Sequence, residues 1–281
     1  MDWQKDKVPI NKGSELIYNC IINSIQNNSG AIIGRHGSTE LTLIMYYEQN
    51  KTVTPSQIKM LERYSGIFNY TNDWLSSYKE ATGLSDIFAG GWYSPLANEE
   101  LLYLAKYKMP IIPLRSLEPY YADQSWLRAL EGQRVTVVSS FADTMREQIT
   151  KPIWDTFPKA NWNFVRSYYC PSIAQGKCEW PNGVDSWSKA VDYLESEVLK
   201  TDPRIVLIGC GGLAMPLALK LKKKGIITVV LGGAIQILFG IKGHRWESHP
   251  VISEFFNDSW VFPSDDEIPN AAEKIEHGCY W

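Results

Sequence analysis

Four short apolar runs recur along this 281-residue chain, each followed by a turn containing glycine or serine and then by an amphipathic stretch. This pattern is typical of strand–turn–helix units, in which a buried strand leads into a helix that packs back onto the sheet. The runs lie at residues 31–34, 134–139, 204–209 and 226–231. Their repetition predicts an α/β fold built on a mainly parallel, Rossmann-like sheet with helices on both faces.

The stretch after each run indicates where the helices lie. Residues 39–49 carry an apolar helical face. A helix over residues 143–150 should stop before Pro152, because the residue preceding a proline is disfavoured in helical geometry. A third helix, over residues 213–223, should end at Gly225. These three helices complete the first three strand–turn–helix units.

Other segments give weaker signals. An apolar helix is expected from Ala234 onward, after the last of the four runs. Residues 87–90 and 109–114 predict shorter strands, and the prolines of the second favour a place at the sheet edge. Residues 171–182, with their glycine and proline, predict a loop.

Composition restricts the class of protein. Hydrophobic residues make up 44% of the chain and charged residues 21%, which is typical of a globular protein and not of a disordered one. The net charge of −3 offers no broad positive surface for a nucleic acid, so we expect no nucleic-acid partner. We expect a single α/β domain over residues 1–281, with a possible lobe boundary near 171–186.

Cysteine content and apolar segments bear on location. The five cysteines are odd in number and form no C-x-x-C pair, which argues against a disulfide framework or a structural zinc site. The first 16 residues contain no apolar core typical of a signal peptide. The most apolar stretch, residues 226–241, is shorter than the roughly 20 residues of a membrane-spanning helix. We therefore expect a cytoplasmic protein without a transmembrane segment.

A glycine-rich turn follows the third run and gives the strongest physical signal for a ligand. Gly209, Gly211 and Gly212 stand between a strand and a helix, where close backbone approach and free N–H groups favour a phosphate. A tight turn without a ligand would have the same sequence. Dinucleotide-binding domains usually place an acidic residue about 20 positions later. The corresponding segment has none, so a dehydrogenase is disfavoured; its own glycine turn makes Gly233 a further candidate for ligand binding.

A second candidate site follows the first run. Arg35, Gly37, Ser38 and Glu40 bring together a guanidinium, backbone amides, a hydroxyl and a carboxylate. This combination suits a diphosphate, or a divalent metal that bridges one. In the alternative interpretation, Ser38 caps the helix and Glu40 only complements its dipole.

Further residues extend the list of candidates. Lys242, Arg245 and Trp246 could offer cationic and aromatic surface to a nucleotide, or could be an ordinary packed tryptophan with surface cations. Ser139 should lie with Arg35 and Gly211 at the carboxyl edge of the sheet. The sequence has neither an H-E-x-x-H zinc motif nor a G-x-S-x-G elbow, which makes a hydrolase a weak alternative.

Three segments together resemble one enzyme family. I-I-G-R-H-G-S-T-E-L, at residues 32–41, resembles the R-F-G-D-G-E-L opening of GT-D-type glycosyltransferases. L-E-G-Q-R-V-T-V-V-S-S-F, at residues 130–141, resembles their middle segment, which precedes a helix bearing a glutamine. The tail, from L-G-G-A-I-Q at residue 231 to G-C-Y-W at the end, is similar to that of uncharacterised members.

The resemblance implies a GT-D-like fold and a glycosyltransferase that uses a nucleoside-diphosphate sugar, UDP-sugar being expected, with a glycan as acceptor. Arg35, Gly37 and Glu40 match the family motif, and Glu40 would be the carboxylate on the diphosphate or metal side. Ser38 stands where the first acid of the Asp-x-Glu pair is expected, so one ligand for Mn²⁺ or Mg²⁺ is missing. The base for the acceptor would be Asp73 or His36, although Asp73 is more simply interpreted as a helix cap or a loop residue.

The tail is also similar to glycosyltransferases of large algal viruses, which add pentoses such as xylose to capsid glycans. That similarity would place the protein in the cytoplasm of a host cell. The competing functional class is a non-catalytic nucleotide- or sugar-binding protein, since the same turns could hold a ligand without promoting transfer.

Overall fold

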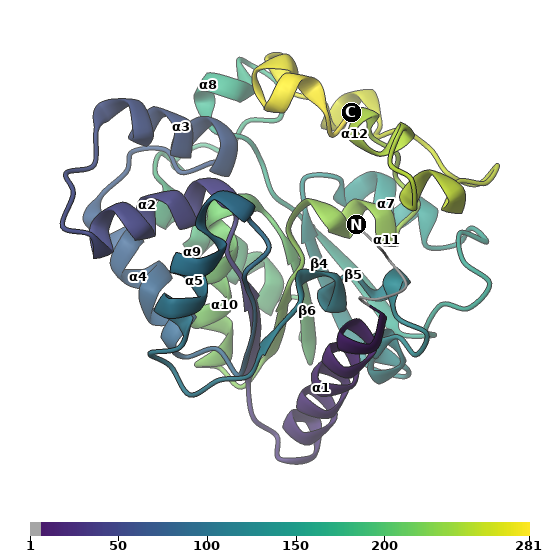
Figure 1. The fold of residues 1–281 in the computed structure, drawn as a ribbon. Coiled ribbons are helices and arrows are strands. Elements are labelled where there is room, and N and C mark those ends of the chain that lie inside the picture. Colours follow the sequence, from purple (N-terminus) through teal and green to yellow (C-terminus); the bar gives the residue numbers. More distant parts are fainter. Residues whose placement is uncertain (1–6) are drawn as a thin grey trace.

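A seven-stranded sheet forms the centre of the protein, in a computed structural model that describes residues 7–281 (Figure 1). The first six residues of the polar N-terminal stretch lie outside the described part. Neighbouring strands are all parallel, in the order β3-β2-β1-β7-β6-β4-β5, which confirms the predicted α/β class. The strands are β1 (Ala31–Arg35), β2 (Ile87–Ala89), β3 (Ile111–Ile112), β4 (Arg134–Ser139), β5 (Asn161–Arg166), β6 (Ile205–Gly209) and β7 (Ile227–Val230).

The four apolar runs of the sequence are the four central strands, β1, β7, β6 and β4. Central parallel strands are covered on both faces, so they need continuous apolar sequence. The two weaker runs are β2 and β3, and β3 lies at the edge, as its prolines predicted. Strand β5, at the other edge, was not predicted, because polar residues interrupt its sequence N-W-N-F-V-R and only Val165 is buried.

Twelve α-helices surround the sheet within the described residues. They are α1 (Lys7–Gln26), α2 (Ser38–Glu48), α3 (Pro55–Ser65), α4 (Asn72–Gly83), α5 (Ala97–Leu104), α6 (Leu114–Leu117), α7 (Ala142–Gln148), α8 (Pro171–Ala174), α9 (Trp187–Leu199), α10 (Ala214–Lys222), α11 (Ile235–Leu238) and α12 (His244–Glu247). Helices α4, α9 and α10 cover one face, and α1, α7 and α11 lie against the other (Figure 1). The predicted placement of helices on both faces is therefore confirmed.

Several helices were not predicted, although their ends carry recognisable signals. Thr54 and Gln57 form a capping box at the start of α3, and Gly66 ends that helix in the left-handed conformation. Two predicted segments also differ. The helix expected from Ala234 is only the short α11, and the loop expected at 171–182 begins with the short helix α8.

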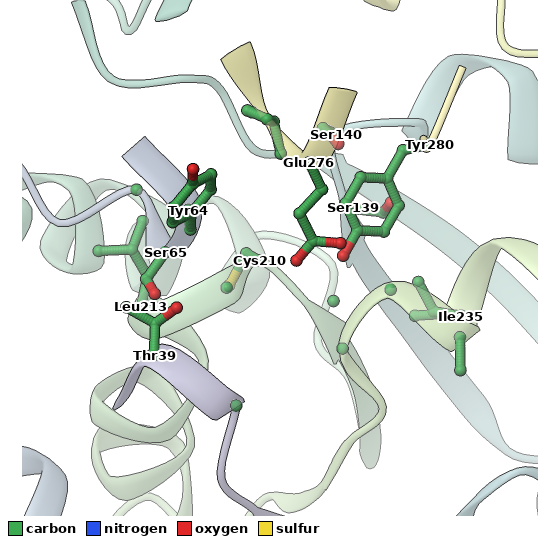
Figure 2. Close-up of a pocket in the computed structure, with 18 of the residues that line it drawn as sticks. Thr39, Tyr64, Ser65, Ser139, Ser140, Cys210, Leu213, Ile235, Glu276 and Tyr280 are labelled. Carbon is green, nitrogen blue, oxygen red and sulfur yellow. The ribbon is translucent and has the colours of Figure 1, made fainter. Parts of the chain in front are cut away.

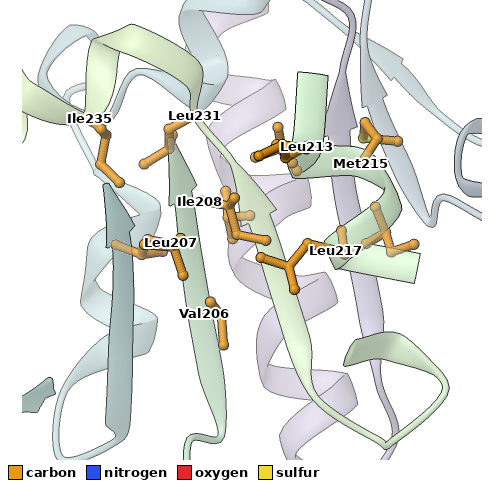
Figure 3. Close-up of a cluster of buried hydrophobic side chains, with 14 of the residues drawn as sticks. Val206, Leu207, Ile208, Leu213, Met215, Leu217, Leu231 and Ile235 are labelled. Atoms are coloured by element: carbon orange, nitrogen blue, oxygen red, sulfur yellow. The ribbon is translucent and has the colours of Figure 1, made fainter. Parts of the chain in front are cut away.

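The apolar core forms where β6 meets its two neighbouring helices. Val206, Leu207 and Ile208 are fully buried in β6, and Leu217 of α10 and Ile235 of α11 belong to the same buried cluster (Figure 3). Strands from before and after residues 171–186 pair directly in the one sheet. Among residues 7–281, no helix combines the length and the apolar character needed to cross a bilayer.

Candidate active site

A cavity of about 430 Å³ opens at the carboxyl edge of the sheet. The carboxyl ends of the four central strands supply its floor. Arg35 and Ser139 are the last residues of β1 and β4, and Gly211 and Gly232 lie in the turns after β6 and β7. Ligands of open α/β sheets bind at this edge, because the strand ends and helix starts leave backbone groups exposed there. The residues predicted to share one edge therefore line one cavity.

Two walls rise from this floor (Figure 2). One wall holds Thr39 of α2 together with Tyr64 and Ser65 at the end of α3. The other holds Glu276 and Tyr280 from the C-terminal segment, which crosses the carboxyl edge of the sheet (Figure 1, Figure 2). The cavity thus depends on segments from both ends of the chain.

Arg35 is held in place on the floor by three contacts. Its Nε donates to the carbonyl oxygen of His36 at 3.2 Å, and its Nη1 donates to that of Leu231 at 3.3 Å. Its guanidinium also lies 5.0 Å from the centre of the Trp92 ring, which lines the cavity. Its Nη2 has no hydrogen-bond partner among residues 7–281, so this nitrogen can donate to a ligand.

Two glycines allow the backbone turns of the cavity floor to pack closely against Arg35 and Ser65. Gly232 has a φ of +63°, and a Cβ there would lie 2.9 Å from Nη1 of Arg35. Gly211 has a φ of +59°, and a Cβ there would lie 2.7 Å from the carbonyl oxygen of Ser65. A side chain at either position would be strained and would collide with the cavity wall.

Glu40 lies in the first turn of α2 and is only 5% exposed. Its carboxylate folds back over Gly37, where any side chain would collide with it. Burial raises the pKa of Glu40, while hydrogen bonds from its own backbone amide and from Ser65, and the charge of Arg35, act in the opposite direction. The carboxylate is thus largely engaged with the start of its own helix.

The residues near Glu40 do not fit a divalent metal site. The neighbouring position that would supply a second acid is Ser38, and burial disfavours the charged form of Glu40. Within the described part of the chain, no three His, Cys, Asp or Glu side chains are grouped so that they could hold an ion. We assign no catalytic step to a metal.

His36 is not a candidate base for this cavity, which corrects the prediction. Its side chain points into the core, fully buried, with Nδ1 2.7 Å from Oε1 of Glu100 and Nε2 3.2 Å from Oγ1 of Thr82. The ring also packs against Phe88, at 4.5 Å between ring centres. Because both ring nitrogens are engaged, His36 holds the turn between β1 and α2 to the core.

Three other predicted residues lie outside the cavity. Asp73 is exposed in the first turn of α4, two positions after the N-cap residue Thr71, so it is neither a cavity residue nor the helix cap. Gly212 is buried behind the turn, where its carbonyl oxygen accepts a hydrogen bond from Nε1 of Trp74 at 3.0 Å. The ammonium of Lys242 lies over the ring of Phe256, 5.4 Å from its centre.

The remaining predicted residues do line the cavity. Gly37, Ser38, Gly209 and Gly233 belong to the strand-end turns, and Arg245 and Trp246 come from α12. The guanidinium of Arg245 lies 4.9 Å from the centre of the Tyr280 ring, and its Nη1 is 3.5 Å from Oε2 of Glu276. Nε1 of Trp246 is buried and lacks a hydrogen-bond partner in the described structure.

One cavity residue with unusual chemistry, Glu118, was not predicted from the sequence. Glu118 stands between α6 and a short 3₁₀ helix, Pro119–Tyr121, and it lines the cavity. Burial raises the pKa of Glu118 to about 7, against the opposing charges of Arg35, Arg115 and Arg245. The local sequence gives no motif for it beyond a glutamate and a proline after the edge strand β3.

Comparisons with known proteins give similarity in structure only. No family model matches the sequence, and no curated protein matches it. A glycosyltransferase of the DUF1792 group from Streptococcus sanguinis shares 14% identity, over 89% of this chain and 94% of that chain, with a TM-score of 0.47. A second structure, of a domain 1792 described as having a distinct glycosyltransferase fold, shares 16% identity over 80% and 81%, with a TM-score of 0.44.

Proposed function

We propose that this protein is a glycosyltransferase that transfers a sugar from a nucleoside-diphosphate donor to an acceptor hydroxyl in the cavity. One observation carries the proposal: Arg35 and Arg245, from opposite ends of the chain, line one cavity with the glycine turns after β6 and β7. Guanidinium groups and backbone amides at the carboxyl edge of a parallel sheet are suited to bind a diphosphate.

The chemistry of the transfer explains why two arginines would be needed. When the bond between the sugar and the diphosphate breaks, negative charge grows on the leaving phosphate oxygens. Arg35 is already oriented by its bonds to His36 and Leu231, so little reorganisation is needed for it to face that charge. Arg245 supplies a second positive charge from the C-terminal segment.

The volume and the aromatic lining support a donor larger than a bare phosphate. About 430 Å³ lies within the range of sites that hold nucleotide-sized ligands. Tyr64, Trp92 and Tyr93 line the cavity and offer flat faces for a base or a sugar ring. In the finer form of the proposal, the donor is a UDP-sugar and the acceptor a glycan, as the family resemblance implies, and the transferred sugar is a pentose such as xylose, as the resemblance in the tail implies.

The test is incubation with UDP-, GDP- and dTDP-sugars, including UDP-xylose, with release of nucleoside diphosphate measured with and without glycoside acceptors. We expect release from one nucleotide class, increasing when an acceptor is added. Binding of a donor in calorimetry without release in any mixture would identify a binding protein instead. Absence of both binding and release would contradict the proposal.

A further inference from the structure

Three carboxylates line the cavity, and two of them are already engaged. Glu40 accepts hydrogen bonds from its own amide and from Ser65. Glu276 lies 3.5 Å from the guanidinium of Arg245 and accepts from the thiol of Cys279 at 3.4 Å. The third carboxylate, Glu118, makes no hydrogen bond or ion pair within residues 7–281, so its oxygen lone pairs are available to a ligand in the cavity.

The backbone around Glu118 restricts where its side chain can go. The residue has extended geometry, with φ of −83° and ψ of 95°, between the end of α6 and Pro119. The proline that follows disfavours helical geometry at Glu118, which limits the backbone conformations open to this turn. Trp126 and Leu117 support it from behind, since Nε1 of Trp126 donates to the carbonyl oxygen of Leu117 at 3.1 Å. Glu118 therefore projects from a fixed support and not from a mobile loop.

We propose that Glu118 is the general base that takes the proton from the acceptor hydroxyl, an inference that rests on the glycosyltransferase function proposed above. The acceptor oxygen forms its bond to the anomeric carbon of the donor sugar while its proton passes to the carboxylate of Glu118. The bond between the anomeric carbon and the diphosphate oxygen breaks at the same time. Its electron pair leaves on the diphosphate, next to Arg35 and Arg245. This single displacement inverts the configuration at the anomeric carbon.

The charge environment suits Glu118 to this task. A base works best when its pKa is close to the working pH, and burial raises the pKa of Glu118 to about 7. The charges that face it are those of Arg35, Arg115 and Arg245, which limit this rise. The neighbouring phenols of Tyr120 and Tyr121 have their own pKa values raised, chiefly by burial and then by the charge of Glu118, so they stay neutral at that pH.

Donor binding should strengthen the base. In the free protein, the positive charges of Arg35 and Arg245 favour the ionised form of Glu118. A diphosphate bound between these arginines would offset their charge, and the pKa of Glu118 would then rise. The carboxylate would therefore hold a proton more tightly when donor is present than when the cavity is empty. Proton acceptance and donor binding are coupled through the same two arginines.

The experiment compares wild type, Glu118→Gln and the control Glu147→Gln, which changes an exposed glutamate of α7 outside the cavity. The probe is the nucleotide sugar that releases most diphosphate in the panel above. We expect Glu118→Gln to lower kcat by at least about a hundredfold, the usual contribution of a general base. Its donor Kd should not increase, because the amide carries no negative charge to oppose the diphosphate. Wild-type kcat should rise with pH through an apparent pKa near or above 7, and this rise should disappear in Glu118→Gln.

The outcomes separate this inference from the proposed function. If wild type releases no diphosphate from any nucleotide sugar, the proposed function is overturned, and this inference with it. If wild type is active but Glu118→Gln keeps more than about a tenth of its kcat, or keeps the pH dependence, the assignment of Glu118 alone is overturned. Two results on the wild type alone would also overturn this assignment: a kcat that does not change with pH, or a product with retained configuration. Neither result depends on whether the variant folds.

Discussion

Nη1 of Arg35 donates a hydrogen bond to the carbonyl oxygen of Leu231 at 3.3 Å, although the two residues are 196 positions apart in the chain. They meet because β1 and β7 are neighbours in the parallel sheet and end at the same edge. The bond orients the guanidinium along the cavity floor, toward the turn at Gly232. The bond fixes the direction of the Arg35 guanidinium, whereas the sequence predicted only that Arg35 lies at the carboxyl edge of the sheet.

Arg35→Lys tests whether this orientation matters. Lysine keeps the positive charge, but its ammonium has no planar face to lie over Trp92 and no fixed fork of N–H groups that could bond to the carbonyl oxygens and point a further donor at a phosphate. We expect kcat/KM for transfer to fall at least about tenfold, which is roughly 1.4 kcal/mol. The unfolding temperature should change little. Arg134→Lys is the control, because Arg134 begins strand β4, at the end of the strand away from the cavity. Equal activity of the two variants would contradict a role for the Arg35 guanidinium.

Gly232→Ala tests the close approach of the β7 turn. The added Cβ would lie 2.9 Å from Nη1 of Arg35, and the φ of +63° strains any side chain. The matched control is Gly132→Ala, where φ is +70° and a Cβ meets nothing within 4 Å. Both variants should lose about 1 kcal/mol of stability in urea unfolding. Only Gly232→Ala should weaken donor binding in calorimetry. Equal donor affinity in the two variants would show that the Cβ at position 232 does not displace the Arg35 side chain.

Glu40→Gln tests whether the carboxylate at the start of α2 acts on the donor. Burial already disfavours its charge, so the amide should cost no more than about 1 kcal/mol of stability. If Glu40 serves the donor, transfer should fall at least about tenfold. A folded variant with wild-type transfer would assign Glu40 to the structure of the turn, with its role limited to the contacts with Gly37 and Ser65.

The free energy of unfolding should depend on pH through Glu118. Its pKa rises from 4.5 to about 7 on folding, so the folded protein holds the proton more tightly than the unfolded chain does. The stability from this group is therefore complete below pH 4.5 and is lost as the pH rises to about 7. Urea unfolding should be measured for wild type and Glu118→Gln between pH 4.5 and about 7. The free energy of unfolding should fall with rising pH in wild type relative to the variant. Parallel curves would place the pKa of Glu118 near its ordinary value.

Treatment with a chelator tests the metal requirement. Ser38 supplies no charge and Glu40 is engaged with its own helix, so we expect no tightly bound divalent ion. After EDTA and gel filtration, the protein should keep most of its transfer activity, with Arg35 and Arg245 facing the diphosphate. Loss of activity that Mn²⁺ or Mg²⁺ restores would show that the site is completed by the substrate's own oxygens.

Much of the fold was predictable because the central strands are local features of the sequence. A parallel strand buried on both faces needs an unbroken apolar run, and the turn after it needs glycine where backbone segments approach closely. Those two requirements identified β1, β4, β6 and β7, and with them the cavity floor at Arg35, Ser139 and Gly211. Edge strand β5 lacks such a run and was missed.

The direction of individual side chains was decided only by tertiary structure. Arg35 and His36 are adjacent in sequence, yet one lines the cavity and the other is buried against Glu100 and Thr82. Nothing local distinguishes them, because the distant partners that set their directions, Leu231 for Arg35 and Glu100 and Thr82 for His36, lie 46 to 196 positions away. The same holds for Glu118, whose pKa depends on burial and on three arginines from different elements. The sequence by itself determined where the sheet offers a site, since strands and turns depend on neighbouring residues. Long-range packing decided which side chains face that site and with what charge.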